Sequence, residues 1–195
     1  MFKKGCLLAL IAVVVVVLLL VGRVIGTYNG LVKLDQEVKN AWAQVETQLQ
    51  RRLDLIPNLV ETVRGYASHE SQTLQAVTEA RAKVAGAGSV NEKINANQEL
   101  SGALARLLVV VEQYPNLKAD ASFRQLQDEL AGTENRIAVE RRRYNETCRD
   151  FNVKVKSFPT VLFASLLGFK PAEMFEAAEG AEQAPKVNFQ TQPTQ

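Results

Sequence analysis

The residues best suited to chemistry in this chain are its one histidine and its two cysteines. His69 is followed by Glu70, as at the start of the zinc-protease motif His-Glu-X-X-His, but Thr73 stands where the second histidine belongs. Because both histidines must share one helical face to hold zinc, the motif fails at an essential ligand. Cys148 is the only cysteine far from the N-terminus, so a Cys-His nucleophile is also poorly supplied. We predict no catalytic and no metal-binding residues, with His69 on the surface of a helix.

Nucleotide and acyl-transfer chemistry also lack their usual sequence signals. The chain has no G-x-G-x-x-G and no G-x-x-x-x-G-K-[ST] loop, so no nucleotide or other cofactor is expected. Residue counts alone leave a Ser-His-Asp triad open, yet no G-x-S-x-G elbow is present to expose a nucleophilic serine. We therefore expect a protein that is not an enzyme.

Two charged residues interrupt the apolar faces that the helices of this chain are expected to bury. Arg52 occupies a heptad position that is otherwise apolar, and Glu134 occupies the position shared with Cys148 and Val155. Regular helices would aim both side chains inward. An unpaired inward charge is costly, so each needs a partner.

Arg52 and Glu134 are the natural partners for each other. If the first and last helices run antiparallel with Tyr28 level with Phe158, the two charges lie at the same level. We hypothesise a buried interhelical ion pair that fixes register more than it adds stability. The residues that could support it are Asn135 and Thr133. The alternative is that each side chain extends to the rim of the apolar stripe and reaches solvent.

An apolar N-terminal segment must anchor these helices. Gly5 to Gly22 carries no charge and is flanked by Lys3, Lys4 and Arg23. A helix of this length spans about 27 Å, and the flanking cations can reach outward to match a hydrocarbon core of about 30 Å. The sequence predicts one membrane span and a water-exposed body after it.

A secretory signal peptide is the alternative to an uncleaved anchor. Val24-Ile25-Gly26 offers small residues, but the apolar run is long for a signal and no A-x-A site follows. Cys6 precedes the run, whereas a lipoprotein cysteine follows it, so we expect a small buried thiol there. Lys3 and Lys4 give a slight positive-inside bias, which favours the N-terminus inside and the body outside the cytoplasm.

Composition excludes two further classes. After residue 27 the chain holds 20 basic and 21 acidic residues, so nothing resembles the basic excess of a nucleic-acid-binding protein. Cys6 lies in the predicted span and Cys148 in the body, which leaves no disulfide framework.

Heptad periodicity predicts an all-α body. The first stretch forms a continuous apolar stripe through Leu31, Val38, Trp42, Val45, Leu49, Ile56, Leu59 and Val63. We expect a kink at Pro57 and leave open whether Gly65 divides this stretch. A glycine-rich boundary at 86–89 precedes a helix over about 91–114, with Ile94, Leu100, Leu104, Leu107, Leu108 and Val111 inward. The last helix repeats an apolar residue every seven positions at Phe123, Leu130, Ile137, Tyr144, Phe151 and Phe158.

These patterns predict an elongated antiparallel bundle of three to four long helices and a short C-terminal helix within 161–167. The predicted domains are a cytoplasmic start and transmembrane anchor at 1–27, a helical bundle at 28–176 and a disordered tail at 177–195. Oligomeric state does not follow from the sequence. The run 141–143 is interpreted as a solvated face, with a lipid or acidic partner as the alternative.

Several dense motifs occur in one order along the chain. They are YNGLV at 28–32, QLQRRLDLIPNLV at 48–60, GYA at 65–67, HE at 69–70, AR at 80–81, YPNLK at 114–118, LQ at 126–127, TENRI at 133–137, RYN at 143–145, FN at 151–152, Pro159 and GF at 168–169. Together they resemble the bacterial LemA family, from the anchor to about Phe175.

The resemblance implies a single-pass protein of the cytoplasmic membrane with an antiparallel helical bundle and no established enzymatic activity. It links the chain to the cell envelope and to partners such as a membrane metalloprotease or a TPM-domain protein, and one branch of the family to magnetosome formation. No catalytic residue is carried over. The motif residues, among them Asn145 and Asn152, are candidates for structure and interaction only.

Three functions follow as hypotheses. The first is a membrane-anchored scaffold or interaction module for envelope partners. The second is a receptor-like sensor whose bundle responds to a small ligand or to protonation through inward groups such as Arg52 and Glu134. The third is an enzyme of unrecognised type.

Overall fold

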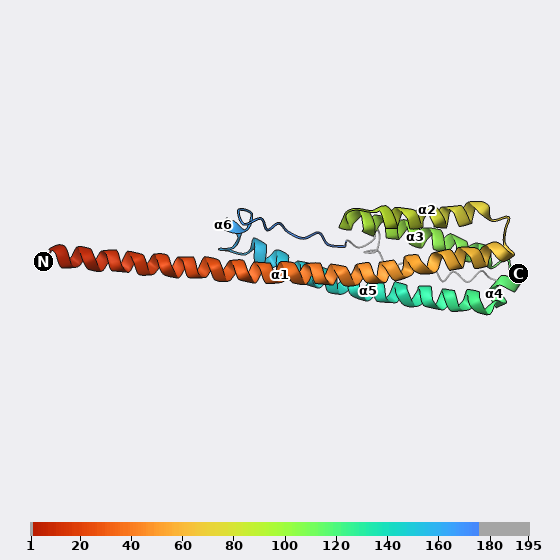
Figure 1. The fold of residues 1–195 in the computed structure, drawn as a ribbon, viewed down its shortest axis with the longest axis horizontal. Coiled ribbons are helices and arrows are strands. Elements are labelled where there is room, and N and C mark those ends of the chain that lie inside the picture. Colours follow the sequence, from red (N-terminus) through yellow and green to blue (C-terminus); the bar gives the residue numbers. More distant parts are fainter. Residues whose placement is uncertain (1, 176–195) are drawn as a thin grey trace, which may run out of the picture.

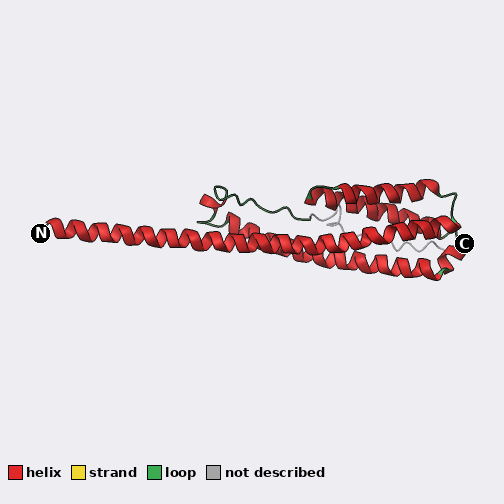
Figure 2. Ribbon diagram, in the orientation of Figure 1, coloured by secondary structure: helices red, strands yellow, loops and turns green. Residues whose placement is uncertain are grey.

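A computed structural model describes residues 2–175, with side chains described from Leu10 onward. It contains six helices and, within that range, no strand (Figure 1; Figure 2). The predicted all-α antiparallel bundle is confirmed. The tail predicted at 177–195 lies outside the described residues.

One helix, α1 (Phe2–Tyr66), runs without interruption from the N-terminal segment to the far end of the body (Figure 1). Its apolar part has a mean hydropathy of 2.7 over 18 residues, none of them buried in the protein, so length and composition suit a membrane span. Pro57 lies inside α1 and does not end it. The helix ends just after Gly65, so the first long stretch is divided there from α2.

The remaining helices fold back against α1. They are α2 (Ser71–Gly86), α3 (Val90–Val111), α4 (Pro115–Ala119), α5 (Ala121–Lys156) and α6 (Val161–Ala164). The hairpin of α2 and α3 covers the outer half of α1, and α5 runs back along α1 toward the N-terminal segment (Figure 1). The fold therefore has a membrane-proximal half built mainly from α1 and α5, and a distal half in which α2 and α3 join them.

Local capping explains where two helices begin. Ser89 and Glu92 form a reciprocal capping box at the start of α3. The carboxylate of Asp120 accepts from the backbone N–H of Phe123 at 2.9 Å at the start of α5. That hydrogen bond holds the pKa of Asp120 below its ordinary value. α3 ends at Val111, three residues short of the predicted end, and the short helix α4 precedes α5.

The buried apolar residues divide into two clusters. The distal core contains Leu53, Ile56, Leu59, Val60, Val63, Ala67, Leu74, Val77, Ala80, Val84, Ala96, Leu100, Ala103, Leu104, Leu107, Val111, Leu117 and Phe123. The proximal core contains Leu31, Val38, Val45, Leu49, Ile137, Tyr144, Cys148, Phe151, Val155 and Ala164. The predicted stripe on α1 is thus shared between two cores rather than one.

Two residues predicted to face inward do not. Phe158 is 80% exposed, because α5 ends at Lys156 and Ser157 is extended, which takes Phe158 out of the helical phase. Leu108 is also exposed and lies at the edge of α3. The heptad repeat therefore predicts burial only for residues that lie within the helix.

Beyond α6, the chain turns at Gly168 and runs back along the bundle as a strap, residues 169–175, without helical turns. Gly168 has a φ of 86°, a conformation that favours glycine. Phe169 packs edge-on against Tyr28 of α1, with ring centroids 5.8 Å apart, and against Phe151 of α5 at 6.4 Å. The strap thereby completes the proximal half of the bundle.

Candidate functional site

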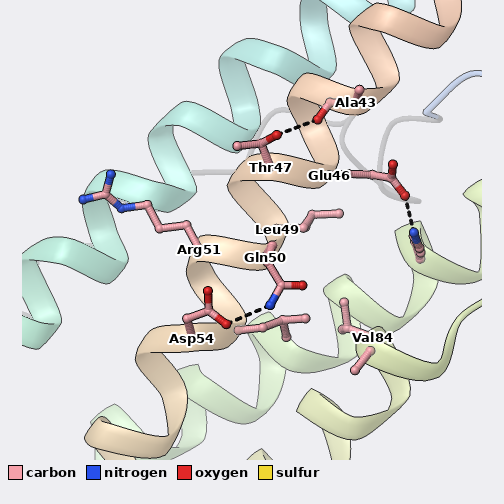
Figure 3. A pocket seen from close by; sticks show the side chains of 11 residues that line it. Ala43, Glu46, Thr47, Leu49, Gln50, Arg51, Asp54 and Val84 are labelled. Atoms are coloured by element: carbon pink, nitrogen blue, oxygen red, sulfur yellow. Dashed lines mark hydrogen bonds and ion pairs between the residues drawn. The ribbon is translucent and has the colours of Figure 1, made fainter.

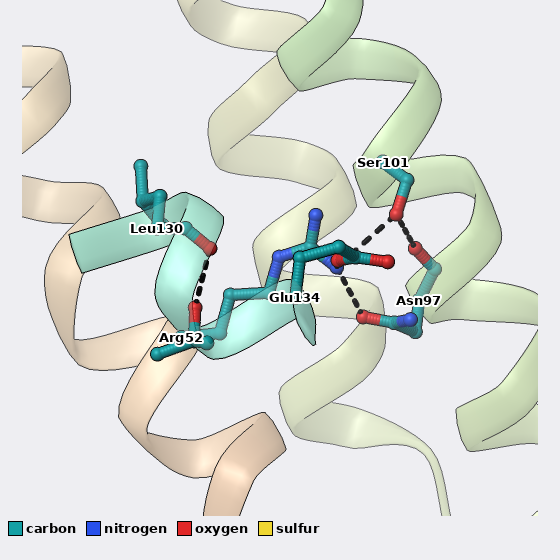
Figure 4. A network of polar contacts seen from close by, with 6 residues as sticks. Arg52, Asn97, Ser101, Leu130 and Glu134 are labelled. Atoms are coloured by element: carbon teal, nitrogen blue, oxygen red, sulfur yellow. Dashed lines mark hydrogen bonds and ion pairs between the residues drawn. The ribbon is translucent and has the colours of Figure 1, made fainter. Parts of the chain in front are cut away.

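A polar layer separates the two cores. Arg52 lies between Leu49 of the proximal core and Leu53 of the distal core, and only 6% of its side chain is exposed. Its Nη1 lies 2.7 Å from Oε2 of Glu134 and donates to Oδ1 of Asn97 at 2.9 Å (Figure 4). The structure therefore brings Arg52 and Glu134 together at the place where α2 and α3 join the bundle.

The two charged residues of this layer differ in their exposure to solvent. Burial lowers the pKa of the Arg52 guanidinium, and the charge of Glu134 opposes that shift. The Nε of Arg52 is buried and has no hydrogen-bond partner. The Oε2 of Glu134 that faces the guanidinium is also buried and meets no donor in hydrogen-bond geometry, although the Glu134 side chain as a whole is 46% exposed. The pair consists of a buried cation and a carboxylate at the rim. This arrangement has features of both alternatives considered from the sequence: Arg52 is buried in an ion pair, and Glu134 extends to the rim of the apolar stripe.

The supporting residues differ from those expected. Asn135 is exposed, and the hydroxyl of Thr133 donates to the carbonyl of Leu130 in its own helix. Support comes instead from α3, where Asn97 and Ser101 both accept from Arg52, Ser101 at 3.1 Å. Both expected supporters lie on α5 beside Glu134, but the free side of the guanidinium faces α3.

A sequence signal for Asn97 exists. It is a polar residue on the inward face of α3, one turn from Ile94 and Leu100, and it is buried. It interrupts that face as Arg52 interrupts α1. The sequence does not specify the register between α1 and α3 that places Arg52 and Asn97 at the same level.

A groove of about 380 Å³ opens beside the polar layer, between α3 and α5. Its walls are largely aliphatic, from Leu59, Leu104, Leu108 and Leu130, and Arg52 and Glu134 lie at one end. Small-molecule sites commonly combine such apolar walls with a few placed polar groups. This groove is the best candidate in the described chain for a small ligand.

A larger hollow, of about 680 Å³, lies between α1 and the ends of α2 and α3 that meet it (Figure 3). Four of its polar side chains form pairs, Glu46 with Lys93 and Gln50 with Asp54 at 2.7 Å, and Thr47 donates to the carbonyl of Ala43. Ligand binding there would have to replace these contacts. We assign no site to it.

The asparagines Asn145 and Asn152 hold the strap. Each amide makes two hydrogen bonds to the backbone of one strap residue: Asn152 with Ala172 at 2.9 and 2.6 Å, and Asn145 with Phe175 at 2.9 and 2.9 Å. Seven residues of helix rise about 10.5 Å, and three residues of extended chain cover about 10 Å. The spacing of the asparagines on α5 therefore matches the spacing of the two strap residues.

Side chains around the asparagines close the strap over the proximal core. The Tyr144 hydroxyl donates to the carbonyl of Glu173 at 2.9 Å, and the Sγ of Cys148 lies 3.6 Å from the same oxygen. Trp42 and Tyr144 pack around Phe175, and the Arg141 guanidinium lies 4.5 Å from the centre of its ring. Burial raises the pKa of both Tyr144 and Cys148. Arg141 therefore packs on this aromatic cluster, although the sequence of the run 141–143 predicts a solvated face.

Within the part of the chain whose side chains are described, His69 and Cys148 are not brought together. His69 is exposed as predicted, but it lies in the turn between α1 and α2 rather than on a helix. Among the described residues, no three histidine, cysteine or acidic side chains could hold a metal ion. Of the predicted anchor flanks, Arg23 is exposed on α1, and Lys3 and Lys4 precede the residues whose side chains are described.

Comparison with known proteins finds similarity to one family. The LemA family model matches residues 41–189. Magnetosome protein MamQ 2 from Paramagnetospirillum magneticum is 27% identical over 175 residues, which cover 76% of this chain and 64% of that protein. Protein LemA from Metamycoplasma hominis is 26% identical over 156 residues, which cover 80% and 71% of the two chains.

The chain spans 64% of the length of the MamQ relatives, which include magnetosome protein MamQ from Magnetospirillum gryphiswaldense at 26% identity. The family match itself extends over more than half of the chain. It includes the polar layer, the asparagines of α5 and the strap. On this match, together with the all-α bundle, the chain belongs to the LemA family.

Proposed function

We propose that this protein is a non-enzymatic, membrane-anchored scaffold of the bacterial cell envelope, which presents its helical bundle to envelope partners. The observation that carries the proposal is the continuity of α1, which passes from the candidate span into both cores without a break. About 44 residues of α1 follow Gly22, which correspond to about 65 Å of helix. Such a rod holds its distal half at a set distance from the bilayer.

Location and partners form part of the same proposal. The span would lie in the cytoplasmic membrane with the N-terminus inside and the body outside, as the positions of Lys3 and Lys4 favour. Family resemblance suggests a membrane metalloprotease or a TPM-domain protein as the partner. The incomplete His-Glu motif at 69–70 and the lack of a nucleotide loop or nucleophile elbow in the sequence support a binding role over an enzymatic one.

Site-specific photo-cross-linking in intact cells tests the scaffold proposal. We expect a cross-linking residue at an exposed distal position, such as Val109 or Leu108, to give discrete adducts with a membrane protein. Buried Leu107, which precedes Leu108 on α3, is the matched control and should give none. Absence of adducts from every exposed position of the body would contradict the proposal, and protease accessibility in spheroplasts would report the orientation.

A sensor is the second candidate function, favoured by the groove beside Arg52. Its aliphatic walls suit a small apolar molecule with an uncharged polar end, because Arg52 is already paired with Glu134 and a ligand carboxylate would meet the Glu134 carboxylate. 1-Decanol is a simple probe, and we expect it to raise the thermal midpoint of the full chain in nanodiscs. The variant Leu104→Trp, which fills the groove, should abolish the increase. An equal increase in both proteins would exclude the groove as the site.

A further inference from the structure

An unexplained apolar surface covers the end of the body that lies nearest the N-terminal segment. Its members are Phe158, Val161, Leu162, Leu166 and Leu167, which surround the short helix α6. We call this surface the apolar tip. Phe158 and Leu166 are 80% and 84% exposed, more than any other large apolar side chain among the described residues. Exposed apolar residues that gather in one place mark a binding surface, whereas scattered ones do not.

The position of the apolar tip along α1 is fixed by a contact. Phe169, which directly follows the tip, packs against Tyr28. Tyr28 lies six residues beyond Gly22, about 9 Å along the helix from the end of the uncharged run. The headgroup layer extends about 5–8 Å beyond the hydrocarbon core. The residue after the tip is therefore level with the outer edge of the headgroups.

The tip is the part of the folded-back chain that lies nearest the span. In Figure 1, α6 lies closer to the N-terminal end of α1 than the end of α5 does. Between Tyr28 and the uncharged run, Val24 and Ile25 are exposed on α1 as well. Exposed apolar side chains therefore continue along α1 beyond the predicted span toward the apolar tip.

The charges around the tip suit a lipid surface. Residues 151–172 contain no acid and three lysines, Lys154, Lys156 and Lys170, all of them exposed. Apolar side chains flanked by lysines characterise segments that lie in the membrane interface, where the lysines remain with the phosphates. Anionic lipids attract such a segment further.

We propose that the apolar tip inserts into the bilayer surface beside the span, as a second membrane contact that seats the body on the lipid. Leu162 and Leu166 enter the boundary between headgroups and acyl chains, and Lys156 and Lys170 bind lipid phosphates. With two contacts, α1 cannot rotate freely about its own axis, and the same face of the bundle always faces away from the membrane.

The test uses the full chain with Cys6→Ser and Cys148→Ser, reconstituted in vesicles of phosphatidylcholine and phosphatidylglycerol. A single cysteine at Leu166 is labelled with an environment-sensitive nitrobenzoxadiazole probe. Val109→Cys is the matched control, because Val109 is 69% exposed and lies at the distal end of α3. Lipids with a doxyl group near the headgroup serve as quenchers, and circular dichroism confirms that both variants are helical.

We expect the probe at Leu166 to emit at shorter wavelength than the probe at Val109, and to lose at least about half of its intensity to the doxyl lipids, as insertion by about 5–10 Å requires. The control should show neither effect. Emission at Leu166 equal to that of the control would overturn the proposal. Short-wavelength emission without quenching would overturn it too, because the tip would then be covered by protein.

Discussion

Replacing Glu134 with leucine is expected to lower the free energy of unfolding by about 2–3 kcal/mol, far more than the loss of an ordinary surface charge. The variant leaves the Arg52 guanidinium buried with only Asn97 and Ser101 as partners, and its Nε already has none. Breaking a fully buried pair costs about 3–5 kcal/mol, and the partial exposure of Glu134 reduces that figure. Denaturant unfolding of the full chain in nanodiscs, followed by circular dichroism, provides the measurement.

The double variant Arg52→Met with Glu134→Leu should recover much of the loss, because methionine can fill the space without a charge. The cycle of single and double variants then yields a coupling energy of about 1–2 kcal/mol. Glu99→Leu is the matched control, since it breaks the exposed pair with Lys83 and should cost less than about 1 kcal/mol. Additive effects of the two substitutions would show that Arg52 and Glu134 do not stabilise each other.

This layer shows what the sequence could and could not predict. Heptad positions on α1 and α5 placed Arg52 and Glu134 inward, and antiparallel counting placed them level, because both inferences need only a regular helix period. The partners from α3 could not be predicted in the same way. Their level depends on the turns at 67–70 and 87–89, whose geometry the sequence does not specify.

The proximal half shows a different limit. The seven-residue row on α5 correctly marked Tyr144 and Phe151 as buried, but what covers them is the strap, which has no periodicity to detect. Asn145 and Asn152 stood out only as motif residues. Their hydrogen bonds go to backbone atoms, so no complementary residue type in the strap could have indicated them. The exposure of Phe158 was missed although the sequence carries a signal for it: Pro159 follows directly, and a residue before proline is biased away from the helical conformation.

The strap is expected to detach when both asparagines that hold it are replaced. Asn145→Ala with Asn152→Ala removes four hydrogen bonds to Ala172 and Phe175, and a loss of about 2 kcal/mol in strap docking corresponds to a roughly thirtyfold increase in the open population. Opening exposes Cys148, which is otherwise fully buried against the carbonyl of Glu173. In a Cys6→Ser background, the rate of reaction with a disulfide reagent should rise by about the same factor.

The pH dependence of that reaction gives an independent check on the cause. Burial raises the pKa of Cys148 in the closed form, which disfavours the reactive thiolate. In the open form the pKa should fall to the ordinary value of about 8.5, and the rate should follow that titration. Asn40→Ala, which removes an exposed asparagine from α1, should leave the rate unchanged. Trp42, the only tryptophan, packs against Phe175, so its emission should shift to longer wavelength in the double variant alone. If thiol reactivity and Trp42 emission both stayed at their wild-type values, aromatic packing rather than the asparagine amides would hold the strap.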